Sequence, residues 1–179
     1  LGGNYLIAAD TGPTIDRYVA YQGGLGWYGQ NNCLFVPGYG SWVVLGVVIT
    51  DVELVPDHPL PSPCSGCQLC IRACPTKALI APFTLDYNKC IAYWTQKKDI
   101  IPHHLRSQLG NFLAGCDLCQ EACPHNQDSD FTHDPWFKPV SGAPYPDLIN
   151  LLKMGKQEWQ RGLGTTAAGW RGKTVFQRN

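Results

Sequence analysis

The chain has 179 residues, which is enough for one large domain or two small ones. Its 14 basic and 14 acidic residues give a formal net charge of +0, which excludes a global field that would draw it onto nucleic acid. Apolar residues make up 44% of the chain and allow a packed core. No stretch approaches the roughly 18 apolar residues of a membrane span, so no membrane segment is expected.

Residues 1–60 alternate between strand-like and helical patterns. Tyr5–Ala9 is a short apolar run that predicts a strand. Ile15–Gln22 predicts a helix that Asp10 or Thr11 caps and that Gly23 ends, because short polar side chains favour N-caps and glycine favours C-caps.

Two further strands are expected in this region, at Cys33–Val36 and Trp42–Thr50. The second is a run of Val, Leu and Ile with little polar interruption, which predicts a strand buried on both faces. Cys33 itself has apolar neighbours, which favours an inert core cysteine over a ligand.

The glycines between these strands match the letters of a dinucleotide fingerprint at Gly24, Gly26 and Gly29. That fingerprint needs a helix to follow directly, and no helical pattern follows here, so we reject a nucleotide site. The glycines and their aromatic neighbours instead predict close approach of the backbone to a flat, bulky ligand.

Eight of the nine cysteines lie in two runs that end in Cys-Pro, or between those runs. The first run, Cys64–Pro75, has the C-x2-C-x2-C-x3-C-P spacing of bacterial ferredoxins. The second run, Cys116–Pro124, lacks one cysteine of that spacing, and Cys90 supplies it. Eight thiolates match two [4Fe–4S] clusters with four ligands each.

In two-cluster ferredoxins the last cysteine of each run binds the other cluster, and this rule assigns the ligands. The first cluster is predicted to bind Cys64, Cys67, Cys70 and Cys123. The second cluster is predicted to bind Cys116, Cys119, Cys90 and Cys74.

Zinc and disulfides are the alternative interpretations of these cysteines. Structural zinc favours paired C-x2-C motifs, which a third cysteine and a Cys-Pro ending fit poorly. A disulfide framework needs an oxidising compartment, and these residues carry no secretory signal pattern. Reduced thiolates and iron–sulfur clusters predict the cytoplasm.

The chain therefore divides into predicted segments 1–60, 61–128 and 129–179. The middle segment is the cluster domain, with short helices expected after Pro75 and from Pro102 to Leu109. Residues 129–147 resemble a linker, and short helices are expected at Leu148–Lys153 and Lys156–Arg161.

Several motifs in this order resemble epoxyqueuosine reductases, over nearly the whole chain. They are Asp10–Pro13, Gly24–Trp27, Gly40–Trp42 with Leu45–Gly46, Cys64–Pro75, Cys90–Gln96, Gly110–Asn111 before Gly115–Asp117, and Gly169–Gly172 before Gln177–Asn179. The resemblance implies an α+β chain: part of an α/β cobalamin-binding domain, then a two-cluster bacterial ferredoxin-like domain and a short α-helical tail. The family has more sequence on both sides, so residues 1–179 are expected to be a fragment.

The resemblance also implies a reaction, the reduction of epoxyqueuosine to queuosine at the wobble position of tRNA. Two [4Fe–4S] clusters would feed electrons to the cobalamin. Asp10 matches the family's general acid, and burial against the corrin would raise its pKa from about 3.9 and leave a usable proton. The alternative is that Asp10 only starts a turn or caps a helix.

Other cofactor residues follow from the same resemblance. Leu34 and Leu45 match positions that pack against the cobalamin, Trp27 and Trp42 line its cavity, and the backbone at Asp117 approaches the corrin. As isolated residues, the leucines are ordinary core residues and Asp117 is an exposed turn residue. The family often has lysine where this chain has Gln30, which weakens any phosphate contact there.

The implied partners are the anticodon region of tRNA and an external electron donor such as a flavodoxin or ferredoxin, with a monomeric protein. A local basic surface for RNA would use Lys97, Lys98, His103, His104, Arg106, Arg171, Lys173 and Arg178. Two other functions stay open: a two-cluster electron carrier for a separate reductase, and a dehalogenase-like cobalamin reductase of a small molecule.

Overall fold

The computed structural model describes residues 3–10, 12–130, 132–137 and 145–179. It forms two compact units. Unit 1 consists of Leu1–Ala73, Leu79–Leu85 and Leu118–Phe131, and unit 2 consists of Cys74–Ala78, Asp86–Asp117 and Thr132–Asn179. Each cysteine run therefore contributes to both units, while the domain boundaries expected from the sequence stay predictions.

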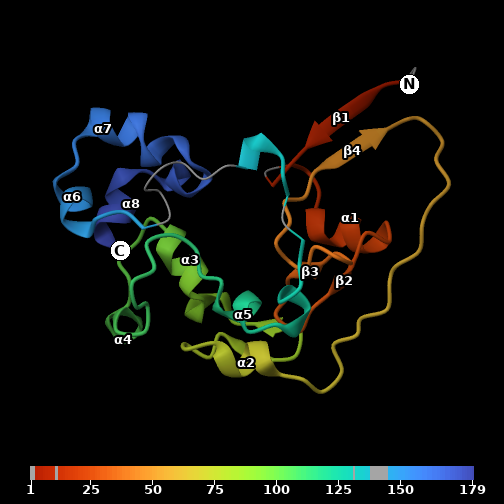
Figure 1. Ribbon diagram of the computed structural model, residues 1–179, viewed down its shortest axis with the longest axis horizontal. Helices are drawn as coiled ribbons and strands as arrows, with labels where there is room; N and C mark the ends of the chain where they lie inside the picture. The colour runs from red at the N-terminus through yellow and green to blue at the C-terminus, as the bar shows by residue number, and fades with distance from the viewer. Residues whose placement is uncertain (1–2, 11, 131, 138–144) are drawn as a thin grey trace. The chain divides into compact units, whose positions relative to one another are not determined.

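Among the described residues, unit 1 contains three two-stranded antiparallel sheets, two of them in the first 60 residues (Figure 1). In the first, β1 (Tyr5–Ala8) pairs with β4 (Val47–Thr50), so that Tyr5 faces Thr50 and Ala8 faces Val47. In the second, β2 (Trp27–Tyr28) pairs with β3 (Leu34–Phe35). The strands expected near the start of the chain and after Cys33 are therefore present.

The strand expected over Trp42–Thr50 is shorter and more exposed than predicted. Only its last four residues form β4, and Val48 and Ile49 are 62% and 42% exposed. The prediction of burial on both faces was wrong because, among the described residues, β4 pairs only with β1, whose Ile7 is itself 68% exposed. An apolar run indicates a surface that prefers to be covered, but not which element covers it.

Helix α1 (Asp16–Gln22) begins and ends close to its predicted limits. Its N-cap is Ile15, which makes no side-chain cap, so the prediction that Asp10 caps the helix was wrong. Asp16, in the first turn of α1, instead holds the preceding loop: its carboxylate accepts hydrogen bonds from the Asp10 backbone N at 2.7 Å and from Thr14 Oγ1 at 2.7 Å. Thr11 lies outside the described residues.

The glycines of unit 1 accommodate protein atoms rather than an open ligand surface. A Cβ on Gly26 would lie 2.0 Å from the Phe35 carbonyl oxygen, and one on Gly29 would lie 2.4 Å from the Phe35 ring. Phe35 is fully buried, so both glycines are needed for the chain to close around it. The expectation that these two positions approach a flat ligand was wrong.

The rest of unit 1 carries parts of both cysteine runs. Its elements are α2 (Leu69–Ala73), the hairpin of β5 (Leu79–Ala81) and β6 (Thr84–Leu85), and α5 (Leu118–Glu121) followed by a 3-10 turn at Pro124–Asn126. The hairpin replaces the helix expected after Pro75, because the chain turns at Cys74–Lys77, where the Lys77 N–H donates to the Cys74 carbonyl at 3.1 Å.

Unit 2 is built from short helices. They are α3 (Ile91–Gln96), α4 (His103–Arg106), α6 (Leu148–Lys153), α7 (Lys156–Arg161) and α8 (Lys173–Arg178), with 3-10 turns at Tyr87–Lys89, Pro135–Phe137, Leu163–Thr165 and Ala167–Arg171. The helices expected after Asp147 and Gly155 occur at the predicted residues.

Two apolar clusters stabilise unit 2. One surrounds α3 and contains Ile91, Trp94, Ile101, Leu105 and Leu109. The other joins α6, α7 and α8 through Leu151, Trp159, Leu163 and Phe176. Burial of these side chains is the main favourable term that holds such short helices in place.

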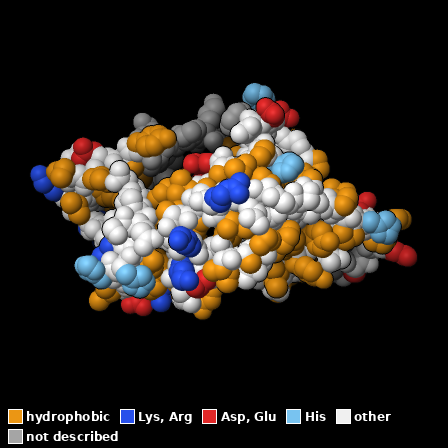
Figure 2. Space-filling model, turned by 90° about the horizontal axis from the view of Figure 1, so that it is seen from below, with side chains coloured by type: hydrophobic (Ala, Val, Ile, Leu, Met, Phe, Trp, Pro, Cys, Tyr) orange, Lys and Arg blue, Asp and Glu red, His pale blue; other side chains and the backbone are white. Residues whose placement is uncertain are grey.

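The surface is mixed in character. Figure 2 shows many hydrophobic side chains exposed on one face, with Lys and Arg in small groups between them rather than in one continuous patch. None of the helices among the described residues is both long and apolar enough to cross a bilayer.

Candidate iron–sulfur and cofactor site

Three cysteines of the first run lie on a turn and on the helix that follows it. Gly66 and Gln68 have positive φ angles of 73° and 56°, which curl the backbone from Cys64 to Cys70. The Arg72 guanidinium donates to the Cys67 carbonyl at 3.1 Å and holds this turn against α2. Such curling lets thiolates separated by two residues point toward a common centre.

Cys123, from the second run, belongs to the same unit and interacts electrostatically with these cysteines. Burial raises the pKa of the Cys123 thiol, and repulsion from the charged forms of Cys64, Cys70 and Cys67 raises it further. Burial also raises the pKa of Cys70, with added repulsion from Cys119 and Cys64. Raised pKa values favour the neutral thiols when no metal is bound. An iron–sulfur cluster would deprotonate these thiols, and its positively charged core would offset the repulsion between the thiolates.

A buried polar network supports this cysteine set, and no sequence pattern indicates it. The Asn126 carboxamide accepts from the Ser41 backbone N at 2.7 Å and donates to Ser41 Oγ and the Gln120 carbonyl, both at 2.8 Å. Ser41 and Asn126 are each 8% exposed. Gly40 has a φ of 62°, and a Cβ there would lie 2.1 Å from Asn126 Oδ1. The network therefore anchors the segment after Cys123 to residues 40–41.

Three of the cysteines predicted for the second cluster belong to unit 2. Cys74 Sγ accepts a hydrogen bond from the Ala78 backbone N at 3.2 Å. Cys90 is the N-cap of α3, and Cys116 packs against the apolar cluster around that helix. The fourth, Cys119, belongs to unit 1, where its carbonyl accepts from Asn31 Nδ2 at 3.2 Å.

Within the described ranges, no three His, Cys, Asp or Glu side chains are close enough to hold a single metal ion. A cubane cluster differs from such a site because each thiolate binds its own iron at a separate corner. The donor set in unit 1 fits that group in chemistry, since it offers four cysteines that form no disulfide.

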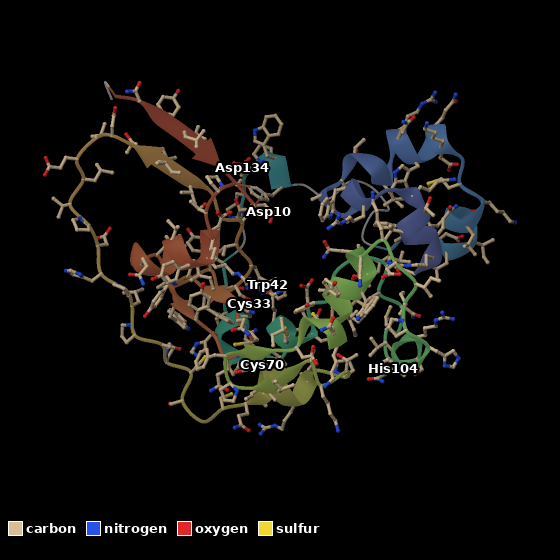
Figure 3. All side chains as sticks on the ribbon, turned by 180° about the vertical axis from the view of Figure 1, so that it is seen from behind. Asp10, Cys33, Trp42, Cys70, His104 and Asp134 are labelled. Carbon is tan, nitrogen blue, oxygen red and sulfur yellow. The ribbon has the colours of Figure 1, made fainter. Side chains whose placement is uncertain are left out.

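Asp10 lies on the loop between β1 and α1, with an exposed side chain (Figure 3). Its φ of 57° places the backbone in the left-handed region, which is uncommon for a residue other than glycine. The hydrogen bond from its backbone N to Asp16 fixes this geometry and leaves the Asp10 carboxylate uninvolved in capping.

The other predicted cofactor residues differ in exposure. Leu34 is 3% exposed and is an ordinary core residue of unit 1, whereas Leu45 is half-buried. Trp42 is 44% exposed and lies on the same unit as Asp10 and Cys70 (Figure 3). Asp117 is exposed and belongs to unit 2.

Two buried polar atoms of unit 1 lack a hydrogen-bond partner among the described residues: Trp27 Nε1 and Gln30 Oε1. The Trp27 ring stacks on Phe35 and meets the edge of His125, while Gln30 Nε2 donates to the Cys64 carbonyl at 2.8 Å. Both atoms therefore belong to segments that contact the first cysteine set. An indole N–H can only donate, so it fits a ligand with acceptors, such as cluster sulfides or the amide carbonyls of a corrin.

Several of the basic residues considered for RNA make contacts within unit 2. Lys97 pairs with Asp99 at 3.2 Å, Lys173 donates to the Met154 carbonyl at 2.9 Å, and Arg106 donates to the Ile101 carbonyl at 3.0 Å. Lys98, His103 and His104 are exposed. These contacts leave fewer cations available to an external ligand than the sequence suggests.

Comparison with known proteins agrees with this arrangement. Residues 63–126 match the family described as "4Fe-4S double cluster binding domain", which includes the ferredoxin-like spacing of both runs. An epoxyqueuosine reductase from Bacillus cereus is 42% identical over 170 residues, or 95% of this chain and 45% of that protein. The enzyme of the same name from Bacillus subtilis is 39% identical over 95% of this chain and 44% of its own length.

This chain is similar to epoxyqueuosine reductases over nearly its whole length. The predicted resemblance is confirmed, and the chain spans about half the length of these curated relatives. A crystal structure of epoxyqueuosine reductase with an epoxyqueuosine-modified tRNA stem loop matches with a TM-score of 0.94 and 37% identity, covering 98% of this chain and 47% of that one. The Bacillus subtilis enzyme, with a catalytic aspartate loop swung out of its active site, matches with a TM-score of 0.91 and 36% identity over 97% of this chain and 46% of its own.

Proposed function

We propose that these residues are part of an enzyme that reduces epoxyqueuosine to queuosine at the wobble position of tRNA, with cobalamin fed by two [4Fe–4S] clusters. The observation that carries the proposal is the placement of Cys64, Cys67 and Cys70 with Cys123 in unit 1, in a chain 42% identical to an epoxyqueuosine reductase. The tRNA stem loop held by a relative supports the substrate.

The ligands of the two clusters follow from the cysteine spacing and from the two units. Cys64, Cys67, Cys70 and Cys123 would hold the first cluster, and Cys74, Cys90, Cys116 and Cys119 the second. Trp27, with its unpartnered indole N–H, and Trp42 and Leu45, with partly exposed apolar side chains, would line the corrin site. When bound, the corrin and the clusters supply the electrons for the reduction.

Asp10 would hold the proton that the departing epoxide oxygen takes up. The reduction of an epoxide to an alkene consumes two electrons and two protons and releases the oxygen as water. A carboxyl group delivers such a proton only when it lies within hydrogen-bond reach of the oxygen. The loop geometry set by Asp16 keeps the Asp10 side chain exposed, and a catalytic aspartate loop in a relative supports this role.

The exposed apolar faces of β1 and β4 support a cofactor domain in which further elements cover this two-stranded sheet. A two-stranded sheet is marginal by itself, and apolar patches mark surfaces that another element covers. We propose a monomer that acts on the anticodon region of tRNA in the cytoplasm and receives electrons from a flavodoxin or ferredoxin.

Anaerobic titration of the iron-loaded, full-length protein with cobalamin, followed by turnover of an epoxyqueuosine-modified stem loop, tests the proposal. Asp10→Asn should lower turnover by roughly 100-fold or more without changing cobalamin binding, because the amide cannot supply the proton. The exposed Asp57→Asn is the matched control and should behave as wild type. Absence of cobalamin binding, or an unchanged Asp10→Asn rate, would overturn it.

A two-cluster electron carrier is the second candidate, because the match to a double cluster domain covers residues 63–126 without needing the cofactor residues. The same titration separates the two. A carrier would contain about eight irons and transfer electrons, yet would bind no cobalamin.

A further inference from the structure

The carbonyl groups at the end of α3 are satisfied by a side chain from the C-terminal helix of unit 2. The Arg178 guanidinium donates to the Trp94 carbonyl at 2.7 Å and also to the carbonyls of Lys97 and Asp99. The last carbonyls of a helix have no partner within it and carry partial negative charge. A partly buried guanidinium fork satisfies several of them at once and matches their charge.

Asn179 extends this contact to a second segment. Its Nδ2 donates to the Thr95 carbonyl at 2.8 Å and to the Leu113 carbonyl at 2.6 Å. Its Oδ1 accepts from Arg178 Nε at 3.0 Å, so the two side chains orient each other. Asn179 therefore ties the end of α3 to the segment that leads into Cys116.

A hydrogen bond to Thr95 closes the connection. Thr95, 1% exposed, accepts on Oγ1 from the Gly115 backbone N at 3.0 Å. Gly115 has a φ of 75°, in the left-handed region that glycine tolerates. The backbone directly before Cys116 is thus fixed against α3 by a buried hydroxyl.

The other end of α3 carries Cys90, a proposed ligand of the second cluster. Cys90 is the N-cap of this six-residue helix, and its carbonyl accepts from the Trp94 N at 3.1 Å. Cys116 packs against the apolar cluster that includes Ile91 and Trp94. Cys90 and Cys116 are therefore attached to one short, rigid element, and Arg178 and Asn179 hold its far end.

We propose that Arg178 and Asn179, in α8 and at its end, are positioning residues for the second [4Fe–4S] cluster, fixing the α3 and Gly115 segments that carry Cys90 and Cys116. The inference rests on the proposed cluster ligands. The reduction potential of a cluster depends on hydrogen bonds to its sulfurs and on solvent exposure. A displacement of α8, which packs on α3 (Figure 1), would therefore change the potential of this cluster.

Neighbouring Gln177 provides a matched control. Its Nε2 donates to the carbonyls of Leu151 at 3.0 Å and Leu152 at 2.9 Å, so it anchors α8 to α6 rather than to α3. Asn179→Asp keeps the size of the side chain but removes both N–H donors. Gln177→Glu removes the donors that bind α8 to α6. An effect that comes only from weaker packing of α8 should therefore appear in both variants.

The test is an anaerobic redox titration followed by electron paramagnetic resonance, with an iron count, on full-length protein. It is done in wild type and in Cys123→Ala, a variant that is expected to lose the first cluster and to keep only the second. We expect Asn179→Asp to shift the midpoint potential of the second cluster, or to lower iron in the Cys123→Ala background from about four toward none. Gln177→Glu should do neither. Asn179→Gln keeps the side-chain N–H donors, so it should behave more like wild type than Asn179→Asp does.

The outcomes separate this inference from the proposed function. If wild type contains only one cluster, the ligand assignment fails and this inference fails with it. If both clusters are present and Asn179→Asp titrates like Gln177→Glu, the positioning role alone is overturned. A first-cluster signal that changes as much as the second would also contradict it.

Discussion

The two candidate cluster sites each combine cysteines from both runs, but different interactions stabilise their surroundings. In unit 1, Cys123 is anchored through a buried polar network in which Asn126 bonds to Ser41 and Gln120. In unit 2, Cys90 and Cys116 are anchored on an apolar cluster around α3. Polar networks specify geometry because each buried polar group without a hydrogen-bond partner lowers the stability of the fold. Apolar clusters also supply stability, but they constrain the direction of contacts less.

The comparison indicates why both kinds of support are needed. α2 and α5, which carry cysteines in unit 1, have five and four residues, far below the roughly 12 residues at which isolated helices become stable. Unit 2 can rely on its core when a ligand is absent. In unit 1 the short helices that carry cysteines depend more on hydrogen bonds and on the cluster itself.

Removal of iron should therefore produce the largest difference between the units. Treating the iron-loaded protein with a chelator under anaerobic conditions should raise amide hydrogen exchange in α2 and α5 toward the rate of an unfolded peptide, because metal binding provides folding energy. Exchange in α7, around the buried Trp159, should change little. Equal protection of α2 and α5 with and without iron would contradict the account.

Truncation of a core side chain should be the next largest effect, and it should fall on unit 2. Leu105→Ala removes a side chain that is 3% exposed and should lower the free energy of unfolding by about 3 kcal/mol. Leu152→Ala, at a leucine 59% exposed in the same unit, should cost far less. Urea unfolding followed by tryptophan fluorescence measures both, and equal losses would refute the assigned core.

Disruption of the polar network should affect unit 1. Asn126→Ala leaves the Ser41 backbone N–H and the Gln120 carbonyl without their partner, which should cost about 2 kcal/mol. The exposed Asn111→Ala controls for loss of an amide. Hydrogen exchange should show increased opening after Cys123 for Asn126→Ala alone. A change confined to unit 2 would show that the network does not support this site.

The smallest expected effect is at Thr95. Thr95→Val keeps the shape of the side chain but removes the acceptor for the Gly115 backbone N–H, which should cost about 1 kcal/mol. Thr174→Val, at an exposed position of unit 2, is the matched control. Urea unfolding measures both variants, and no difference between them would indicate that the Gly115 N–H finds another partner.

Local signals predicted part of this fold correctly. The helix at Leu148–Lys153 follows from Asp147, whose side chain caps it by accepting from the Asn150 N at 2.7 Å. The resemblance to epoxyqueuosine reductases is likewise confirmed by relatives, whereas the ligand sets that the cysteine spacing gives stay a prediction. Signals of this kind depend on residues a few positions apart, which a sequence displays directly.

The rest depended on contacts between distant residues. Asn126 and Ser41 are 85 positions apart, and Asn179 and Thr95 are 84 apart, so neither pair leaves a periodic pattern. The glycines near Phe35 resembled a ligand surface because the sequence does not reveal that an aromatic ring fills the space beside them. The apolar run ending in β4 resembled a buried strand for the same reason.

The exchange of ligands between the two runs is tested most directly by an iron count on a double variant, Cys64→Ala with Cys123→Ala. If both cysteines bind the first cluster, the double variant keeps the second cluster intact and contains about four irons per chain. Cys64→Ala with Cys74→Ala, two cysteines of one run, should then lose nearly all iron because it damages both clusters. The account is contradicted if the Cys64 and Cys123 double variant loses nearly all iron while the Cys64 and Cys74 double variant keeps about four.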